Sequence, residues 1–71
     1  MSKSILQTVA IAVRSRRTAL AISQEELGER SGLHRTYIGG IERAERNLTL
    51  GALEKIANAL GCAVSDLVKP T

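Results

Sequence analysis

Residues Gln24 to Glu42 read QEELGERSGLHRTYIGGIE, and this stretch decides the fold. Apolar residues recur at helical spacing on both sides of Gly32, which indicates two short helices. Gly32 stands where the chain must turn, and such a turn favours a residue that can adopt a positive φ. Gly28 lets the two helices approach closely. The segment, about residues 23–42, is therefore predicted to be a helix-turn-helix, whose second helix enters the DNA major groove. The residues expected to face inward are Leu27, Ser31, Leu33, Ile38 and Ile41.

The start of the first of these two helices is well specified. Ser23 can accept a hydrogen bond from the backbone N–H of Glu26, and the Glu26 side chain can reach back to the N–H of Ser23. Ile22 and Leu27 occupy the positions of a hydrophobic staple across this capping box. The Ser23 cap, the reciprocal contact of Glu26 and the staple all predict that a helix begins here. We expect this helix to end near Ser31.

Three further helices are predicted outside this segment. Residues from about Ser4 to Ala19 form an amphipathic helix, and Thr49 caps a helix that ends before Gly61, where a left-handed residue is wanted. A short last helix covers about residues 63–68. The predicted fold is all-α, a compact five-helix bundle in a single domain over residues 1–71. The expected apolar faces are Ile5, Leu6, Val9, Ala10 and Val13 in the first helix and Leu50, Leu53, Ile56, Ala57 and Leu60 in the fourth.

The composition allows one small domain and favours an anionic partner. The chain has 71 residues, 44% of them hydrophobic, and a net charge of +3. A mild positive charge fits either nucleic-acid binding or an ordinary soluble domain with a few surplus cations. The cations are mostly arginine, whose planar guanidinium suits phosphate and guanine. Their placement favours DNA, because the seven arginines precede or flank the second helix of the motif: Arg14, Arg16, Arg17, Arg30, Arg35, Arg43 and Arg46.

Enzymatic and metal chemistry have little support in the sequence. Cys62 is alone, so neither a disulfide framework nor a metal cluster is expected, and a buried thiol is favoured over a redox sensor. His34 is the single histidine, and no paired acid–base or phosphate-loop constellation accompanies it. An enzyme is therefore rejected, and no cofactor, metal or small-molecule effector is expected. No apolar stretch is long enough to span a membrane, and the N-terminus does not fit a secretion signal, so a cytoplasmic protein is predicted.

The first turn of the second motif helix is the candidate base-reading surface. Arg35 can donate two hydrogen bonds to guanine, and Thr36 can contact a thymine methyl or accept a bond. Gly39 and Gly40 are costly inside a helix, and two interpretations are open: a close approach of the bare backbone to DNA, which we favour, or a short, frayed helix. His34 is expected at the N-cap, either as a plain cap or as a contact to a phosphate or base edge. With few side chains left to read bases, DNA shape would contribute to specificity.

The motifs SQEELGERSGL (23–33), HRTYIGGIERAERNLTL (34–50) and LEKIANALG (53–61) resemble the Cro/CI-type helix-turn-helix proteins of the XRE family. The resemblance covers about residues 9–67 and implies a lambda repressor-like DNA-binding domain that binds double-stranded DNA. The stretch RTYIGGIERAERNLTL is similar to restriction–modification controller proteins, which are small dimeric regulators. Prophage-type repressors and the antitoxins of toxin–antitoxin modules remain alternatives.

A second set of residues is expected to contact DNA phosphates, fixing register without reading sequence. Ser23 and Gln24 lie at a helix N-terminus, which attracts anions. Tyr37 could donate to a phosphate or pack on the side of its helix. The resemblance adds positions whose counterparts contact the backbone in similar proteins, although the last two could equally cap the next helix: Arg43, Arg46, Asn47 and Thr49.

The resemblance also implies a buried salt bridge between Arg17 and Glu42, tying the first helix to the third. Two exposed charges, or a phosphate contact from Arg17, are the alternatives. The sequence departs from the family at Ala21 and Ala44, where glycine is frequent, and at Arg16, where an apolar residue is usual. Ala44 is therefore expected either to adopt a strained left-handed conformation or to lie in a locally different loop.

The function predicted from these residues is a sequence-specific transcriptional regulator that binds a palindromic operator as a homodimer. The dimer surface is expected within residues 56–68, because so short a last helix exposes much apolar surface. A protein–protein adaptor without DNA binding is the alternative from another class, and acidic or apolar residues in place of the arginines would have indicated it. The residues expected at the dimer surface are Leu60, Ala63, Val64, Leu67 and Val68.

Overall fold

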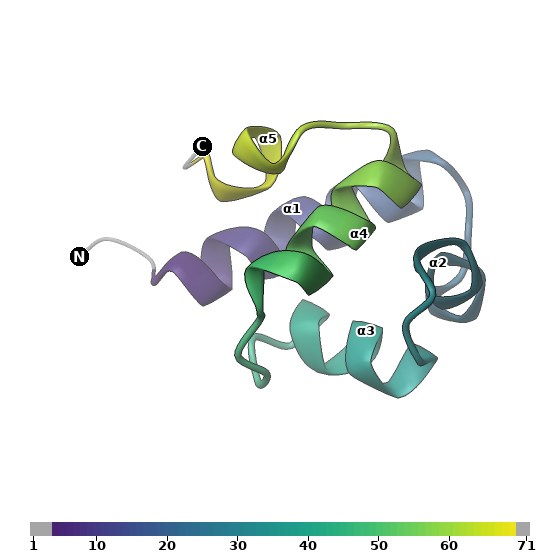
Figure 1. Ribbon diagram of the computed structural model, residues 1–71, viewed down its shortest axis with the longest axis horizontal. Coiled ribbons are helices and arrows are strands. Elements are labelled where there is room, and N and C mark those ends of the chain that lie inside the picture. Colours follow the sequence, from purple (N-terminus) through teal and green to yellow (C-terminus); the bar gives the residue numbers. More distant parts are fainter. Residues whose placement is uncertain (1–3, 70–71) are drawn as a thin grey trace.

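Five helices follow one another along the chain in the computed structural model, which describes residues 4–69 (Figure 1). They are α1 (Ile5–Ala19), α2 (Gln24–Ser31), α3 (Arg35–Glu42), α4 (Leu50–Leu60) and α5 (Val64–Val68). The described part contains no strand, so the predicted all-α bundle and its helix bounds are confirmed. None of the helices in this part is both long and apolar enough to cross a membrane.

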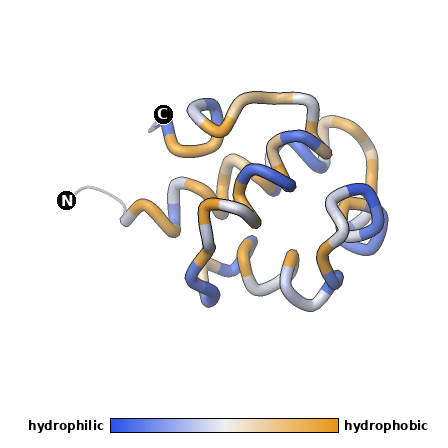
Figure 2. The backbone as a smooth tube through the Cα atoms, viewed as in Figure 1, coloured by the Kyte–Doolittle hydropathy of each residue, from blue (hydrophilic) through white to orange (hydrophobic). Residues whose placement is uncertain are grey.

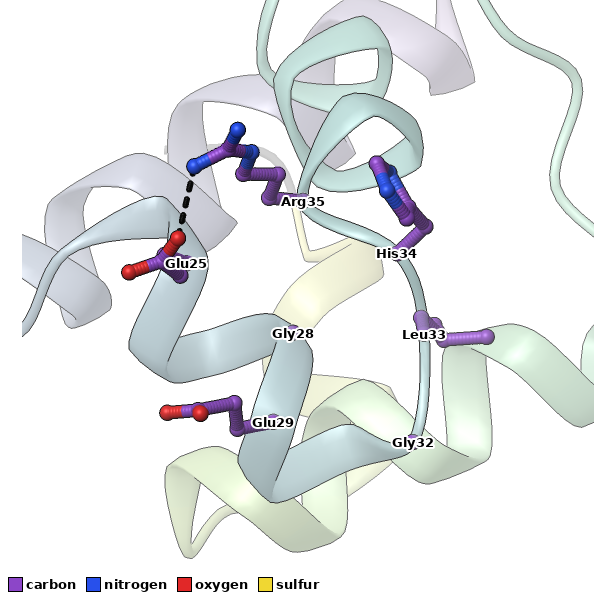
Figure 3. Close-up of a pocket in the computed structure, with 7 residues that line it drawn as sticks. All are labelled: Glu25, Gly28, Glu29, Gly32, Leu33, His34 and Arg35. Carbon is purple, nitrogen blue, oxygen red and sulfur yellow. Dashed lines mark hydrogen bonds and ion pairs between the residues drawn. The ribbon is translucent and has the colours of Figure 1, made fainter.

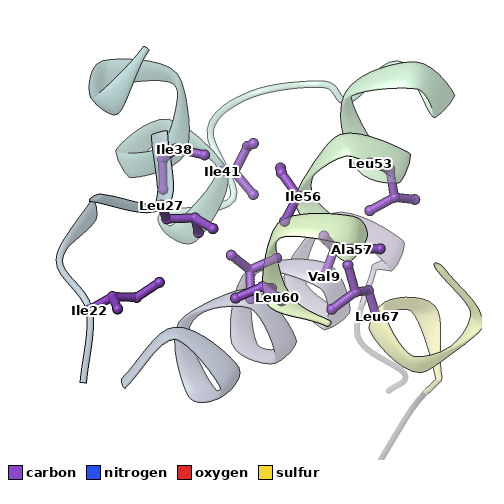
Figure 4. Close-up of a cluster of buried hydrophobic side chains, with 11 residues drawn as sticks. Val9, Ile22, Leu27, Ile38, Ile41, Leu53, Ile56, Ala57, Leu60 and Leu67 are labelled. Atoms are coloured by element: carbon purple, nitrogen blue, oxygen red, sulfur yellow. The ribbon is translucent and has the colours of Figure 1, made fainter. Parts of the chain in front are cut away.

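The helices pack around one apolar core, to which each of them contributes (Figure 4). Helix α1 contacts α3, α4 and α5, while α2 contacts α3 and α4. Hydrophilic segments lie outside this core, most visibly along α2 and in the loop after α3 (Figure 2). The buried residues that form the core are Val9, Val13, Ile22, Leu27, Ile38, Ile41, Leu53, Ile56, Ala57, Leu60 and Leu67.

Two residues of the predicted apolar faces, Ile5 and Leu50, are exposed. The exposed fraction of Ile5 is 58% and that of Leu50 is 84%. Both are the first residue of their helix, Ile5 in α1 and Leu50 in α4. Helical spacing assigns them to the apolar face, but the buried part of that face begins after the first residue of each helix. The periodicity therefore predicted correctly which side of each helix is apolar, but it predicted that the buried part of this side begins too early in the helix.

Leu60 and Leu67 were predicted at the dimer surface, and this prediction was wrong. The exposed fraction of Leu60 is 7%, and Leu67 is completely buried. Both leucines belong to the apolar core of the monomer, in which α4 contacts α1, α2 and α5, and α5 contacts α1 and α4. The other three predicted residues remain at least partly accessible: Ala63 is exposed, and Val64 and Val68 are half-buried.

Helix starts are defined by side-chain caps. The Ser23 hydroxyl accepts a hydrogen bond from the Glu26 N–H, and Thr49 accepts from the Ala52 N–H in the same way. The reciprocal half of the predicted capping box at Ser23 is absent among the described hydrogen bonds. The Glu26 carboxylate accepts from the guanidinium of Arg30, one turn later, instead. A cation four residues away competes successfully with the backbone for this carboxylate.

Within residues 4–69, four residues adopt the left-handed conformation at turns. Gly32 and Gly61 do so with φ of 76° and 72°, as predicted for the residues that end α2 and α4. Ala21 and Ala44 do so with φ of 59° and 58°. The expectation of a strained Ala44 is thus confirmed. An alanine in this region costs about 1–2 kcal/mol more than it does in a right-handed one.

Replacing Ala44 with glycine is expected to stabilise the protein by about 1 kcal/mol, because glycine adopts this backbone conformation without strain. The measurement is the free energy of unfolding from denaturant titration. The control is Ala12→Gly, a half-buried alanine in the interior of α1, where glycine should destabilise instead. A loss of stability in Ala44→Gly would contradict the strain.

Candidate DNA-binding surface

Helix α3 presents a polar first turn because its apolar residues hold its opposite side in the core. Ile38 and Ile41 have exposed fractions of 0% and 2%. Arg35 and Thr36, in contrast, are exposed. His34 is the N-cap, as predicted, and its Nδ1 accepts a hydrogen bond from the Thr36 N–H. The His34 cap and the buried isoleucines thus fix the start of α3, and the side chains of Arg35 and Thr36 remain exposed to solvent.

Gly28 sets the distance between α2 and the turn that follows it. A Cβ at this position would lie 2.5 Å from the Leu33 carbonyl oxygen and 3.2 Å from the Arg35 backbone nitrogen. Both atoms belong to the backbone and cannot rotate away. The predicted close approach is therefore confirmed, and it positions the residue that begins α3.

Gly39 and Gly40 were predicted on the exposed side of α3, and this prediction was wrong, because both are buried. A Cβ at Gly40 would lie 2.5 Å from Arg46 Cγ, and one at Gly39 would lie 3.0 Å from an Arg43 guanidinium nitrogen and 3.2 Å from Gln24 Oε1. The missing side chains make room for long polar side chains that fold back over the helix. The exposed surface of α3 that was predicted to read bases is correspondingly shorter than predicted.

Arg17 and Glu42 form the predicted salt bridge between α1 and α3. Arg17 Nε lies 2.6 Å from Glu42 Oε2 and Nη2 lies 3.0 Å from Oε1, a bidentate pair. Arg17 Nη1 donates to the Ile22 carbonyl, and Gln24 Nε2 donates to Glu42 Oε1. The hydrogen bond that Arg17 donates to Glu42 raises the pKa of Arg17. Burial lowers this pKa, and the negative charge of Glu42 raises it further. With every guanidinium nitrogen engaged, Arg17 is committed to the scaffold, and a phosphate contact from it is no longer expected.

Arg35 is held by a partner that the sequence interpretation missed. Its Nη1 lies 2.6 Å from Oε2 of Glu25, in the first turn of α2, and both side chains are mostly exposed. Figure 3 shows the two side chains pointing toward each other beside an open pocket lined by Gly28 and the turn. The capped start of α2 could have placed Glu25 in the first turn of that helix. Because Glu25 and Arg35 lie ten residues apart, no local sequence pattern predicts their contact.

The loop after α3 brings further cations beside the helix. Arg46 lies over the ring of Tyr37, with its guanidinium carbon 5.9 Å from the ring centroid. The Tyr37 hydroxyl donates to the Asn47 carbonyl at 3.5 Å, and its ring packs against the core, so the packing role of Tyr37 is the one observed. Arg43 pairs with Glu45 at 2.9 Å. The predicted phosphate-contacting residues of the loop are exposed together: Arg43, Arg46, Asn47 and Thr49.

Cys62 lies outside this surface, at the start of the connection to α5, and is half-buried against the core. Burial raises the pKa of its thiol, Asp66 acts in the same direction, and Arg16 opposes them. A raised pKa leaves less of the reactive thiolate at neutral pH.

Comparison with known proteins agrees with this geometry. Residues 13–67 match the model of the family described as "Helix-turn-helix". The control protein C.SmaI of Serratia marcescens is 52% identical over 64 residues, which are 90% of this chain and 76% of that protein. The crystal structure of the restriction–modification controller protein C.AhdI of Aeromonas hydrophila is 42% identical with a TM-score of 0.85, covering 87% of this chain and 94% of the other.

A third relative extends the likeness beyond the controller proteins. The crystal structure of a hypothetical transcription factor from Neisseria is 39% identical with a TM-score of 0.91, covering 94% of this chain and 77% of the other. The match to the family model spans the helices α2 and α3 described above, including the exposed first turn of α3. The chain belongs to the XRE-type helix-turn-helix family of DNA-binding regulators, which includes the restriction–modification controller proteins.

Proposed function

We propose that this protein is a sequence-specific transcriptional regulator that binds a palindromic operator as a homodimer and reads bases with Arg35 and Thr36. The observation that carries the proposal is the exposed first turn of α3, held in place by buried isoleucines on its other side. An exposed guanidinium and a hydroxyl at a helix N-terminus match the side chains that read guanine and thymine in the major groove. Two of the three relatives named above are control proteins, which supports a role in a restriction–modification system.

The loop cations would supply the sequence-independent part of binding. Arg43 and Arg46 are exposed on the segment that leaves α3, and Asn47 and Thr49 follow them. Ser23 and Gln24 offer a second contact at the N-terminus of α2, whose first N–H groups attract a phosphate. The Gln24 side chain is held in place at this N-terminus, because its amide donates a hydrogen bond to Glu42. These contacts would set the register of α3 in the groove.

A two-fold dimer would hold two copies of α3 about 34 Å apart, the spacing of successive major grooves on one face of DNA. Its interface would involve α5, where Ala63 is exposed and Val64 and Val68 are only half-buried. The test is sedimentation equilibrium: the protein should be a dimer, and Ala63→Lys should weaken it. Selection from random duplexes should recover two related half-sites about one helical turn apart. A monomer that selects a single half-site would refute the dimer.

Replacing Arg35 with alanine is expected to weaken operator binding by about 1–3 kcal/mol and to relax the preference at one base position. The measurement is a binding isotherm for the selected operator and for variants of it. The control is Lys55→Ala, which removes the same charge from the exposed side of α4. Equal affinity of the Arg35 variant and the wild type across the operator variants would contradict base reading by Arg35.

A further inference from the structure

Glu25 places a negative charge within the proposed DNA-reading surface. Its carboxylate contacts Arg35 directly, 2.6 Å from Nη1, and the side chains of Arg35 and Glu25 are 62% and 63% exposed. An exposed ion pair of this kind contributes little to folding. A carboxylate that faces duplex DNA is repelled by the phosphates, so it lowers the affinity for every duplex. The helix dipole favours a carboxylate in the first turn of α2, but it does not explain why this carboxylate contacts Arg35.

The contact has a geometric consequence for Arg35. Guanine is read by two guanidinium nitrogens that lie in one plane and point at O6 and N7. A free arginine side chain has several rotatable bonds and reaches phosphates or bases in many directions. Glu25 holds Nη1 from the side of α2 and leaves the remaining nitrogens of the fork open (Figure 3). The pair thus restrains the plane of the guanidinium before DNA arrives.

We infer that Glu25 is a specificity-determining residue that orients Arg35 toward guanine. The inference rests on the proposed function, because it assumes that Arg35 reads a base. In a duplex with guanine at the right position, Arg35 keeps Glu25 and gains two hydrogen bonds. In a duplex without it, Arg35 must leave Glu25 to find another acceptor, and the carboxylate then faces DNA without its partner. Glu25 therefore lowers binding to incorrect sequences more than binding to the operator.

The test is the isosteric substitution Glu25→Gln, with Glu29→Gln as the matched control. Glu29 lies one turn further along α2, is exposed, and forms no ion pair among the described residues. Both substitutions remove one negative charge from the same helix. The dissociation constant is measured for the selected operator and for the same duplex with the guanine read by Arg35 changed to adenine. The ratio of the two constants is the discrimination.

Glu25→Gln is expected to lower this discrimination by about twofold to fivefold, the range that an exposed ion pair supports, and to bind random duplexes more tightly. Glu29→Gln should tighten random binding and leave the discrimination unchanged. Unchanged discrimination in Glu25→Gln, or an equal fall in Glu29→Gln, would overturn the inference. Thermal unfolding of both variants should match the wild type, because all the altered atoms are exposed.

The experiment also separates the two proposals. If the wild-type protein selects no duplex, or Arg35→Ala relaxes no base position, the proposed function fails and the inference falls with it. A different outcome is that the wild type selects an operator and Arg35→Ala relaxes the preference at one base position. If Glu25→Gln then keeps the wild-type discrimination at that position, only the role of Glu25 is refuted.

Discussion

Replacing Glu42 with alanine is expected to destabilise the protein by about 3–5 kcal/mol, the cost of leaving a buried charge without its partner. Glu42 is nearly inaccessible, with 2% of its side chain exposed, and Arg17 has 13%. The substitution would also free the Gln24 amide. Small domains are stable by only about 5–15 kcal/mol, so a large share of the total would be lost. Denaturant titration measures the effect.

The control for Glu42→Ala is the double substitution Arg17→Met with Glu42→Leu. Replacing both members of a buried pair by apolar residues of similar size is often neutral. The double variant should therefore be more stable than the single one. A single variant within about 1 kcal/mol of the wild type would show that the pair does not hold α1 against α3, since that loss is typical of an exposed pair.

Replacing Gly28 with alanine is expected to cost about 1–3 kcal/mol, the range for an extra methyl group in a closely packed site. The new Cβ would meet the Leu33 carbonyl at 2.5 Å, and relief requires the turn to move away from α2. Because the Arg35 nitrogen lies 3.2 Å away, the same movement would displace the start of α3. Operator affinity should therefore fall, even where the variant remains folded.

Gly51→Ala is the matched control for Gly28→Ala. Gly51 is exposed in α4, and the nearest atom to a new Cβ is Thr49 Oγ1 at 4.0 Å. Here alanine should stabilise the protein by about 0.5–1 kcal/mol through its higher helix propensity. The two substitutions should therefore change the free energy of unfolding in opposite directions. Equal changes in the free energy of unfolding would show that the turn moves away from a Cβ at position 28 without cost.

The helices and turns could be predicted from the sequence because their signals are local. The caps at Ser23 and Thr49 and the left-handed glycines at 32 and 61 each depend on a few neighbouring residues, and all of them are observed. The pair of Arg17 and Glu42 is not local. It was expected from the resemblance to a family, and the residues between the two positions contain no other signal for it.

The surface of α3 was predicted less well because long side chains decide it. Helical spacing places Gly39 and Gly40 on the open side, but Arg43, Arg46 and Gln24 fold back over them. Helical spacing predicts the direction in which a side chain leaves the backbone, but it does not predict where the end of a long, flexible side chain lies. The contact of Glu25 with Arg35 was missed for the same reason. The burial of Leu60 and Leu67 depends on how the helices pack against one another, which is a tertiary property.

The stacking of Arg46 on Tyr37 over Gly40 links two positions that lie six residues apart. A Cβ at position 40 would occupy the place of Arg46 Cγ, because the two atoms would be only 2.5 Å apart. Any residue with a Cβ at 40 would therefore push the Arg46 side chain away from its place over the ring. Homologous sequences should consequently show coupled variation at these two sites, with glycine at 40 accompanying arginine at 46.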